Sequence, residues 1–317
     1  MPLAHLPTPV LPLDRLGREL GLPEGTLLAK HDDLTGLAGG GNKVRKLEYL
    51  CADALEQGCD VLVTGGGRQS NHARLTAAAA ARLGLDCHLV LASDRPDEPT
   101  GNVVLDEALA PAIEWVGRRD YYGTEAAIRE VSDRLADEGR RPYRVPVGGA
   151  SAVGALGYVR AARELLEQVP DVDVVVVADG SGGTQAGLVA GFGDHDRVLG
   201  IDVGTRPDLE ETVPETATET ALLAGLDRPT GEVRVDHTRY GEGYGVPTDT
   251  AREALDLAGR LEGMLVDPVY TAKALAGLIG AVREGSIRPG RRVVFLHTGG
   301  LPALLATRYA QWVRERP

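Results

Sequence analysis

The sequence predicts an α/β protein built on open, mostly parallel sheets. Short continuous runs of Val, Ile and Leu alternate with helix-like segments along most of the chain, as expected when parallel strands are covered by helices on both faces. Glycine-rich turns directly follow two of these runs, at residues 65–67 and 180–183. A chain of 317 residues is long for a single hydrophobic core, so one large or two smaller domains are expected.

The expected elements alternate in chain order. A strand at residues 60–64 leads through glycines into an alanine-rich helix over 70–83, and a second strand follows at 87–91. A helix over 102–109, a short strand at 113–116, a polar helix over 124–138 and an extended segment at 143–146 come next. A helix over 154–168 precedes the most apolar strand, 172–178, and later strands are expected at 198–203 and 292–296. The polar segment 207–236 is expected to form a helix and a surface excursion.

Composition argues against several classes of protein. The net charge is 34 − 46 = −12, which disfavours a nucleic-acid partner because phosphates require a basic face. The sequence contains no apolar run of about 18 residues that would span a membrane, and residues 1–12 do not resemble a signal peptide. Cys51, Cys59 and Cys87 lack metal-ligand spacing, and their odd number gives no disulfide framework. We therefore expect a cytoplasmic protein with buried thiols and no metal site.

Lysine is rare in this chain. Only four of the 34 basic residues are lysines, namely Lys30, Lys43, Lys46 and Lys273. An amine can lose its proton and attack a carbonyl, whereas a guanidinium effectively cannot, so a retained lysine suggests Schiff-base chemistry. Lys43 follows Gly-Gly-Gly-Asn at residues 39–42 and opens an expected helix, whose dipole opposes a cation and helps to lower the pKa of the amine. An ordinary surface charge is the alternative.

The turn after the strand at 172–178 has the composition of a phosphate-binding loop. Its glycines allow backbone N–H groups to converge at the start of a helix, and two hydroxyls stand among them: Gly180, Ser181, Gly182, Gly183 and Thr184. The spacing matches neither the dinucleotide fingerprint nor a Walker loop. A glycine turn that serves only close strand-to-helix packing is an equally good explanation of this loop taken alone.

Other polar side chains follow predicted strands or stand beside glycine or proline. Ser70 and Asn71 could bind a carboxylate, although helix capping is the simpler explanation, and His72 is more simply a packed or solvent-facing histidine than a base. Tyr244 and Tyr270 could contact a ligand or merely pack with their hydroxyls satisfied. Thr298 follows the strand at 292–296 and precedes paired glycines, which places it at the ligand-binding edge of the sheet.

Together these segments resemble the pyridoxal-phosphate enzymes of the tryptophan-synthase-β fold (fold type II), and more narrowly the 1-aminocyclopropane-1-carboxylate deaminase / D-cysteine desulfhydrase family. The resemblance runs from residue 6 to residue 300 and depends most on Gly-Asn-Lys-Val-Arg-Lys-Leu-Glu-Tyr at residues 41–49. It implies pyridoxal 5'-phosphate as cofactor, a small amino-acid substrate and a homodimer. It also implies two α/β domains: a larger one of residues 1–48 and 160–317, and a smaller one of residues 49–159 that closes over the substrate.

The family implies a role for each candidate residue. Lys43 would form the Schiff base with the cofactor and later move protons, and Ser70 would contact the substrate carboxylate or assist proton transfer. The remaining roles are ring-oxygen binding by Asn71, phosphate binding by Gly180, Ser181, Gly182, Gly183 and Thr184, a pyridine-nitrogen contact by Thr298, and substrate contacts by Asn71, His72, Tyr244 and Tyr270.

Three positions bear on the substrate. In the deaminase branch a Glu follows the motif tyrosine and a Leu precedes the last Gly-Gly pair, whereas this chain has Thr271 and Thr298, which resemble the D-cysteine desulfhydrase branch. These residues favour α,β-elimination of D-cysteine to pyruvate, ammonia and sulfide, with Thr271 at the substrate. Arg68 replaces a usually aliphatic residue; it could face solvent or bind a second anionic group, which makes a cysteate sulfo-lyase the alternative. A 1-aminocyclopropane-1-carboxylate deaminase and a non-enzymatic small-molecule sensor are further alternatives.

Overall fold

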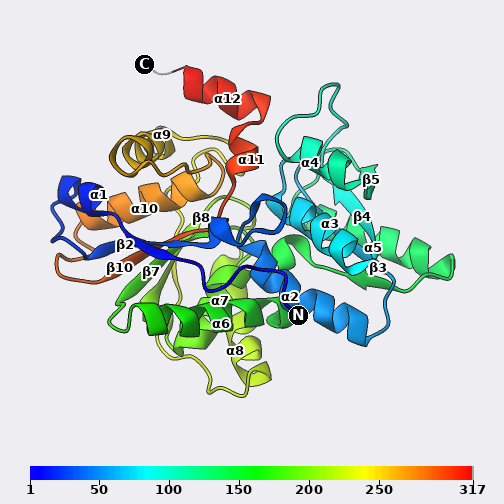
Figure 1. The fold of residues 1–317 in the computed structure, drawn as a ribbon, viewed down its shortest axis with the longest axis horizontal. Helices are drawn as coiled ribbons and strands as arrows, with labels where there is room; N and C mark the ends of the chain where they lie inside the picture. The colour runs from blue at the N-terminus through cyan, green and yellow to red at the C-terminus, as the bar shows by residue number, and fades with distance from the viewer. Residues whose placement is uncertain (316–317) are drawn as a thin grey trace.

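The computed structural model describes residues 1–315 and contains two sheets lying side by side (Figure 1). The larger sheet has six strands in the order β1-β2-β10-β7-β8-β9. Only β1 is antiparallel to its neighbour, and the other pairs are parallel. The strands span Val10–Pro12 (β1), Leu27–His31 (β2), Val293–His297 (β10), Val174–Asp179 (β7), Val198–Asp202 (β8) and Arg234–Asp236 (β9).

The smaller sheet has four strands in the order β5-β4-β3-β6, all parallel. They span Ala112–Trp115 (β5), Asp86–Leu91 (β4), Val61–Gly66 (β3) and Pro142–Arg144 (β6). The central strand β3 is buried along its whole length because helices cover both faces of the sheet. This arrangement explains why its sequence is continuously apolar rather than alternating.

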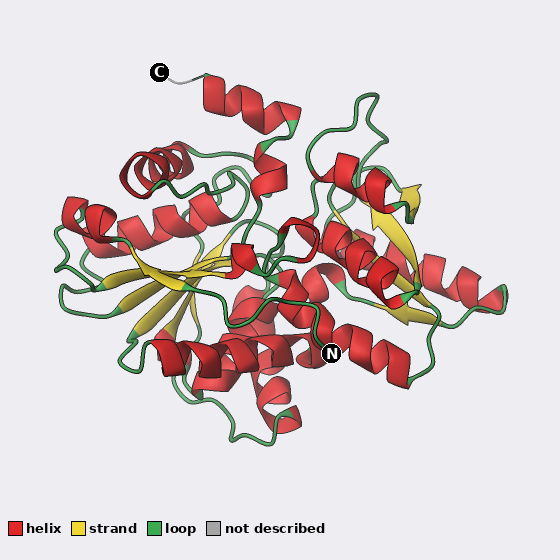
Figure 2. Cartoon of the chain, in the orientation of Figure 1, coloured by secondary structure: helices red, strands yellow, loops and turns green. Residues whose placement is uncertain are grey.

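Helices form a layer on each face of both sheets, as the cartoon in Figure 2 shows. On the larger sheet, α1 (Asp14–Glu19), α9 (Asp249–Leu257) and α10 (Thr271–Arg283) share one apolar core, and α6 (Ala152–Gln168), α7 (Gly183–Phe192) and α8 (Leu209–Leu223) share the other. On the smaller sheet, α2 (Lys43–Glu56) and α3 (Asn71–Leu83) pack on one face and α5 (Tyr121–Asp137) on the other. Each fully buried Leu or Val in these cores contributes about 1.5–3 kcal/mol.

The remaining helices are short. They are α4 (Asn102–Leu109), α11 (Leu301–Leu304), α12 (Thr307–Arg314), a π-helical segment at Ala258–Glu262, and single 3-10 turns at Asp32–Leu34, Leu37–Gly39, Val147–Gly149 and His195–Arg197. No helix within residues 1–315 is long and apolar enough to cross a membrane. The cysteine thiols are free, with Cys51 and Cys87 buried and Cys59 partly exposed.

The structure confirms the α/β class and most of the expected elements. The most apolar run, expected at 172–178, forms β7 two residues later. The polar segment 207–236 contains the expected helix, α8, and a largely exposed loop over residues 224–233, and it then ends in the edge strand β9, which the sequence did not predict. The proposed domain boundaries, 48/49 and 159/160, fall inside α2 and α6, which pack against each other. The exact division into residues 1–48 with 160–317 and residues 49–159 therefore stays a prediction.

Candidate active site

A cavity of about 420 Å³ lies between the two sheets, where the loops after β3 and β7 meet. Open parallel sheets bind their ligands at this edge, beyond the carboxyl ends of the strands. The cavity brings together most of the residues that the sequence singles out: Lys43, Ser70, Asn71, His72, Gly180, Ser181, Gly182, Thr184, Tyr244, Tyr270 and Thr298.

Lys43 is the first residue of α2, and its partly buried side chain lines the cavity. Its Nζ forms no hydrogen bond or ion pair with another residue of the chain between residues 1 and 315. Burial lowers the pKa of this amine to about 8, although the nearby Asp179 carboxylate acts in the opposite direction. A lysine with this pKa is substantially neutral in mildly alkaline solution and can attack a carbonyl.

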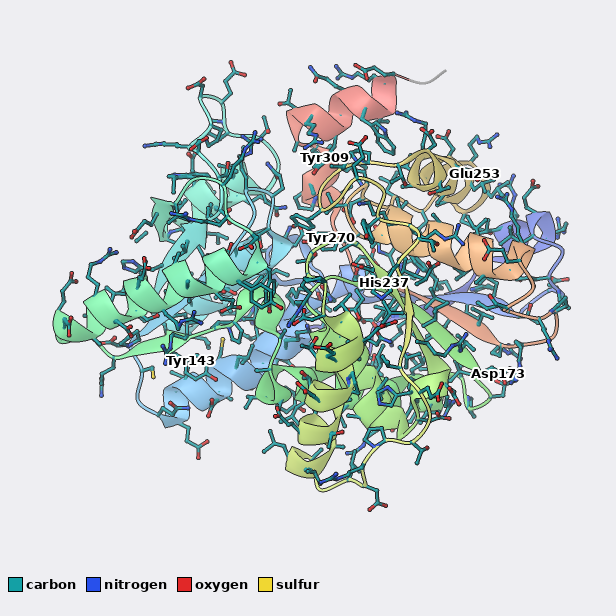
Figure 3. The ribbon with its side chains drawn as sticks, turned by 180° about the vertical axis from the view of Figure 1, so that it is seen from behind. Tyr143, Asp173, His237, Glu253, Tyr270 and Tyr309 are labelled. Atoms are coloured by element: carbon teal, nitrogen blue, oxygen red, sulfur yellow. The ribbon has the colours of Figure 1, made fainter. Side chains whose placement is uncertain are left out.

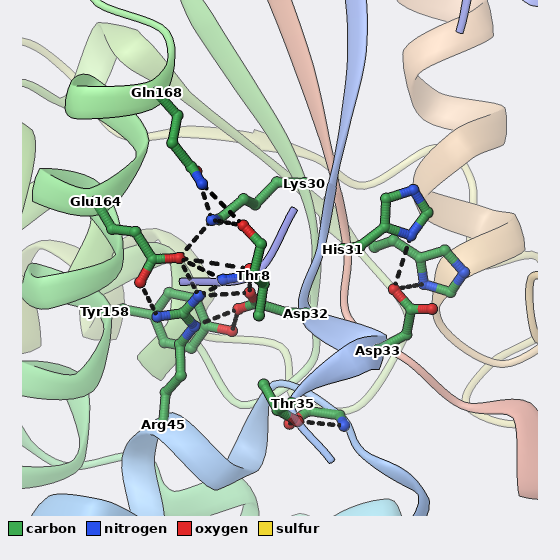
Figure 4. A network of polar contacts seen from close by, with 12 residues as sticks. Thr8, Lys30, His31, Asp32, Asp33, Thr35, Arg45, Tyr158, Glu164 and Gln168 are labelled. Atoms are coloured by element: carbon green, nitrogen blue, oxygen red, sulfur yellow. Dashed lines mark hydrogen bonds and ion pairs between the residues drawn. The ribbon is translucent and has the colours of Figure 1, made fainter. Parts of the chain in front are cut away.

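Arg45 explains why α2 presents Lys43 at this point (Figure 4). Its buried guanidinium donates two hydrogen bonds of 2.8 Å to Asp32, after β2, and bonds of 2.9 and 2.8 Å to the two oxygens of Glu164 in α6. Lys30 of β2 also donates to Glu164, and the Tyr158 hydroxyl donates to Asp32. Arg45, two residues after Lys43, therefore holds the start of α2 against the larger sheet.

Lys46 lies beside the cavity without lining it, and the sequence did not single it out as a candidate site residue. Its amine is fully buried and donates to the carbonyl of Gly148 at 3.0 Å, and burial followed by the charge of Lys43 holds its pKa well below the usual value. A Cβ atom placed on Gly183 would lie only 3.0 Å from this Nζ, so the amine lies beside the start of α7. With its pKa lowered in this way, the amine serves as a buried hydrogen-bond donor beside the start of α7 rather than as a fixed positive charge.

The loop between β7 and α7 has the geometry of an anion cradle. The Asp179 carboxylate accepts the backbone N–H of Gly182 at 2.9 Å, and Gly182 has a φ of 86°, which favours glycine. Helix α7 begins at the next residue, so its unpaired N–H groups and dipole face the cavity. Thr184 supplies a hydroxyl that accepts from the Asn42 amide at 3.1 Å. Burial raises the pKa of Asp179 to about 6.

The loop between β3 and α3 supplies a second polar wall. The Ser70 hydroxyl caps α3 by accepting the N–H of Ala73 at 3.1 Å, which confirms the capping interpretation, and Ser70 also lines the cavity. Asn71 accepts from the Asn102 amide at 3.0 Å through Oδ1, which leaves its own NH₂ group for a ligand. His72 is buried, its Nε2 lies 3.0 Å from the Thr64 hydroxyl, and burial with the charges of Lys43 and Lys46 keeps its pKa well below the usual value.

Two tyrosines and a threonine line the cavity from the larger sheet. The hydroxyls of Tyr244 and Tyr270 lie 2.5 Å apart, and their rings pack edge to face. Burial raises the pKa of both phenols, so both stay protonated at neutral pH and can act as proton donors. Thr298 follows β10, and its backbone carbonyl accepts the N–H of Asn42 at 3.0 Å.

Two of the candidate substrate contacts, Arg68 and Thr271, do not line the cavity. Arg68 is exposed in the turn after β3 and does not line the cavity, in keeping with the cost of burying an unpaired charge. Thr271 is fully buried at the start of α10, where its hydroxyl donates to the Asp267 carboxylate at 2.8 Å and does not reach the cavity. A different cation, Arg119, lines the cavity. The sequence did not single it out because it lies just before α5 and belongs to no recognisable motif.

These groups fit pyridoxal phosphate. Lys43 offers an amine of lowered pKa for an aldehyde, the β7–α7 loop offers backbone donors for a phosphate, and Asn71 offers an amide for a ring oxygen. Within residues 1–315, Asp179 Oδ2 and the Thr205 hydroxyl are buried polar atoms at this cavity without a hydrogen-bond partner, as expected where a polar ligand belongs. Fold and site together define a pyridoxal-phosphate enzyme with two open α/β sheets.

Comparison with known proteins gives the same result. The chain belongs to the pyridoxal-phosphate-dependent enzyme family, whose sequence model matches residues 1–299. A 1-aminocyclopropane-1-carboxylate deaminase of Burkholderia ambifaria is 43% identical over 99% of this chain and 97% of its own length. A D-cysteine desulfhydrase of Salmonella typhi is 40% identical over 96% of this chain and 98% of its own length.

Solved structures agree. A crystal structure of a deaminase homologue superposes with a TM-score of 0.89 at 37% identity, covering 98% of this chain and 94% of that one. Threonine deaminase isoform 2 from Solanum lycopersicum shares the fold, with a TM-score of 0.70 at 16% identity, covering 97% of this chain and 82% of that one. The predicted family, fold type and cofactor are thereby confirmed.

Proposed function

We propose that the chain catalyses the α,β-elimination of D-cysteine, with uptake of one water, to pyruvate, ammonia and sulfide. The observation that carries this proposal is Thr298 at the cavity, a neutral hydroxyl where the family resemblance expects the partner of the ring nitrogen. Bound pyridoxal phosphate supplies an electron sink for the electrons released at Cα, and a neutral partner makes that sink a mild one. A mild sink suits a β substituent that departs readily.

The chain's own groups supply the proton transfers. Lys43 is the base that takes the Cα proton, because its pKa of about 8 makes a neutral amine available. Ser70 and the N-terminal end of α3 bind the substrate carboxylate, which lies in the favourable field of a helix N-terminus. The paired hydroxyls of Tyr244 and Tyr270 stay protonated and deliver a proton to the departing sulfur.

Each of two alternative substrates is supported by a specific observation. Arg119 lines the cavity and could pair with the sulfonate of cysteate, a role that the sequence left open for Arg68 beside solvent exposure. Relatives such as the Burkholderia ambifaria protein, at 43% identity, bear the deaminase name, which favours 1-aminocyclopropane-1-carboxylate as substrate. A homodimer and a cytoplasmic location stay predictions; light scattering of the purified protein tests the first.

The test is a substrate screen with the purified holoenzyme. Release of 2-oxo acid, sulfide and sulfite is measured with D-cysteine, L-cysteine, L-cysteate, D-serine, β-chloro-D-alanine and 1-aminocyclopropane-1-carboxylate, and with Lys43→Ala as the inactive control. We expect the highest kcat/KM for D-cysteine, with equal amounts of pyruvate and sulfide. A higher kcat/KM for cysteate, or for the cyclopropane, would replace D-cysteine by that substrate.

A further inference from the structure

We propose that Lys273 is a positioning residue for Tyr244: its buried amine fixes the loop at residues 240–245 and so holds the Tyr244 hydroxyl against that of Tyr270. The structural part of this proposal concerns the protein alone, and its kinetic part rests on the proposed function. Lys273 does not line the cavity, so it acts through the loop rather than on a ligand.

The amine of Lys273 donates both of its hydrogen bonds to that loop. The side chain is fully buried in α10, and Nζ donates to the backbone carbonyls of Tyr240 at 2.9 Å and Gly243 at 3.1 Å. Burying an ammonium group is costly unless it is hydrogen-bonded, and burial lowers the pKa of Lys273 to about 8 even with Asp202 and Asp267 acting in the opposite direction. The two carbonyls offset this cost and are held in place in return.

The loop has no regular secondary structure of its own, so its position depends on such contacts. At the end of the loop the Tyr309 hydroxyl donates to the Gly245 carbonyl at 2.9 Å, and Tyr309 packs in the same apolar cluster as Tyr270 (Figure 3). A Cβ atom on Gly204 would lie 3.0 Å from the backbone nitrogen of Tyr244, so the chain passes close beneath the loop. Lys273 and Tyr309 therefore both hold the segment that carries Tyr244, through backbone carbonyls before and after it.

Tyr244 needs this support because its side chain extends across the cavity. It keeps 37% of its surface exposed, and its ring would lie 3.4 Å from a Cβ atom on Gly67, in the loop after β3 of the smaller sheet. A shift of the loop by an ångström would break the 2.5 Å contact between the tyrosine hydroxyls.

The N-terminal end of α10 fixes the positions of both Tyr244 and Tyr270. The Asp267 carboxylate accepts the N–H groups of Val269, Tyr270 and Thr271 at 2.9, 3.0 and 3.0 Å, which fixes Tyr270 at the beginning of α10. Lys273 follows three residues later and reaches the loop of Tyr244. A long, flexible side chain with three donors suits two divergent carbonyls, which accounts for a lysine here in a chain that otherwise uses arginine.

The test compares Lys273→Met, which keeps the apolar stem and removes the donors, with the wild-type holoenzyme. Hydrogen–deuterium exchange of the amides at 240–246 should rise at least about tenfold. With D-cysteine, kcat should fall about tenfold to a hundredfold at nearly unchanged KM, because the catalytic hydroxyl is misplaced. Cofactor affinity and the visible spectrum should not change. Tyr244→Phe should reproduce the kinetic loss without raising exchange.

Arg197→Met is the matched control. Arg197 also donates to a backbone carbonyl, that of Val172 at 2.6 Å, before the start of β7 and away from the cavity. It should leave both exchange at 240–246 and kcat unchanged. Unchanged exchange or unchanged kcat in Lys273→Met overturns the proposal, and if that variant does not fold, Lys273→Gln is judged by the same criteria. A wild-type enzyme that turns over none of the screened amino acids refutes the proposed function instead, and the exchange comparison still decides the role of Lys273.

Discussion

Arg45→Met tests the ionic cluster that holds α2, and with it Lys43, in place. The variant keeps the apolar stem but leaves Asp32, which is fully buried, without its guanidinium partner. Breaking a buried ion pair from one side costs about 3–5 kcal/mol. The Glu164 carboxyl gives a second measure: burial acts to raise its pKa, but Arg45 and Lys30 outweigh burial and lower it from 4.5 to about 2, which corresponds to about 3 kcal/mol.

Because Lys30 still contacts Glu164 in the variant, we expect a loss at the lower end, about 3 kcal/mol. The assay is urea unfolding of the holoenzyme followed by far-ultraviolet circular dichroism. Arg134→Met is the control, since the Arg134–Glu114 pair is 50% and 42% exposed and should be worth less than about 1 kcal/mol. If Arg45→Met lost no more stability than Arg134→Met, the reasoning about the cluster would be refuted.

The same cluster gives a pH dependence of defined sign. A carboxyl whose pKa is lowered in the folded state contributes stability that is complete above its unfolded pKa and is lost as the pH falls through the folded one. For Glu164 this window runs from about pH 4.5 down to about pH 2. Wild-type unfolding midpoints should therefore decline across this range, and Arg45→Met should show a flatter profile.

Three further predictions concern the cavity. The rate at which the apoenzyme takes up pyridoxal phosphate should rise with pH, with a midpoint near the Lys43 pKa of about 8, and a stopped-flow rate that is flat between about pH 7 and 9 would contradict this. Gly182→Ala should weaken cofactor binding about tenfold in a fluorescence titration because φ is 86°, whereas Gly193→Ala, at a φ of 71° beyond the other end of α7, should not. Arg119→Ala should raise KM for cysteate but not for D-cysteine, and Arg68→Ala should change neither.

The sequence predicts those strands whose burial shows in their composition. Continuous apolar runs identify β3 and β7 within two residues of their observed starts. Strand β2 is not recognisable in the same way, because Leu27–His31 ends in Lys30 and His31. The buried amine of Lys30 is satisfied by the Thr8 carbonyl and by Glu164 and Gln168, and the last two lie 134 and 138 residues away in the chain.

The same distinction applies to the residues of the site. Lys43 and the loops after β3 and β7 are predictable because their chemistry is local to a few residues. The positions of Arg68 and Thr271 could not be fixed from the sequence, because the direction of a side chain depends on what packs beside it. Arg68 faces solvent, which was one of its two predicted outcomes, and Thr271 faces Asp267. The function of Arg45 depends on a partner 119 residues away.

The scarcity of lysine is informative for the other three lysines as well as for Lys43. Lys30, Lys46 and Lys273 are all at most 1% exposed, and each donates to a partner inside the protein. In a chain that otherwise favours arginine, each of these three lysines occupies a buried position where a compact amine with rotatable donors can meet its partners.

The central claim is that Lys43, among four lysines, is the residue that binds the cofactor covalently. The most direct measurement is borohydride reduction of the purified holoenzyme, followed by proteolysis and mass-spectrometric mapping of the modified lysine. The account predicts a single pyridoxyl group on Lys43 and loss of the visible cofactor absorbance in Lys43→Ala. Modification of Lys30, Lys46 or Lys273, or no modified lysine at all, would contradict it.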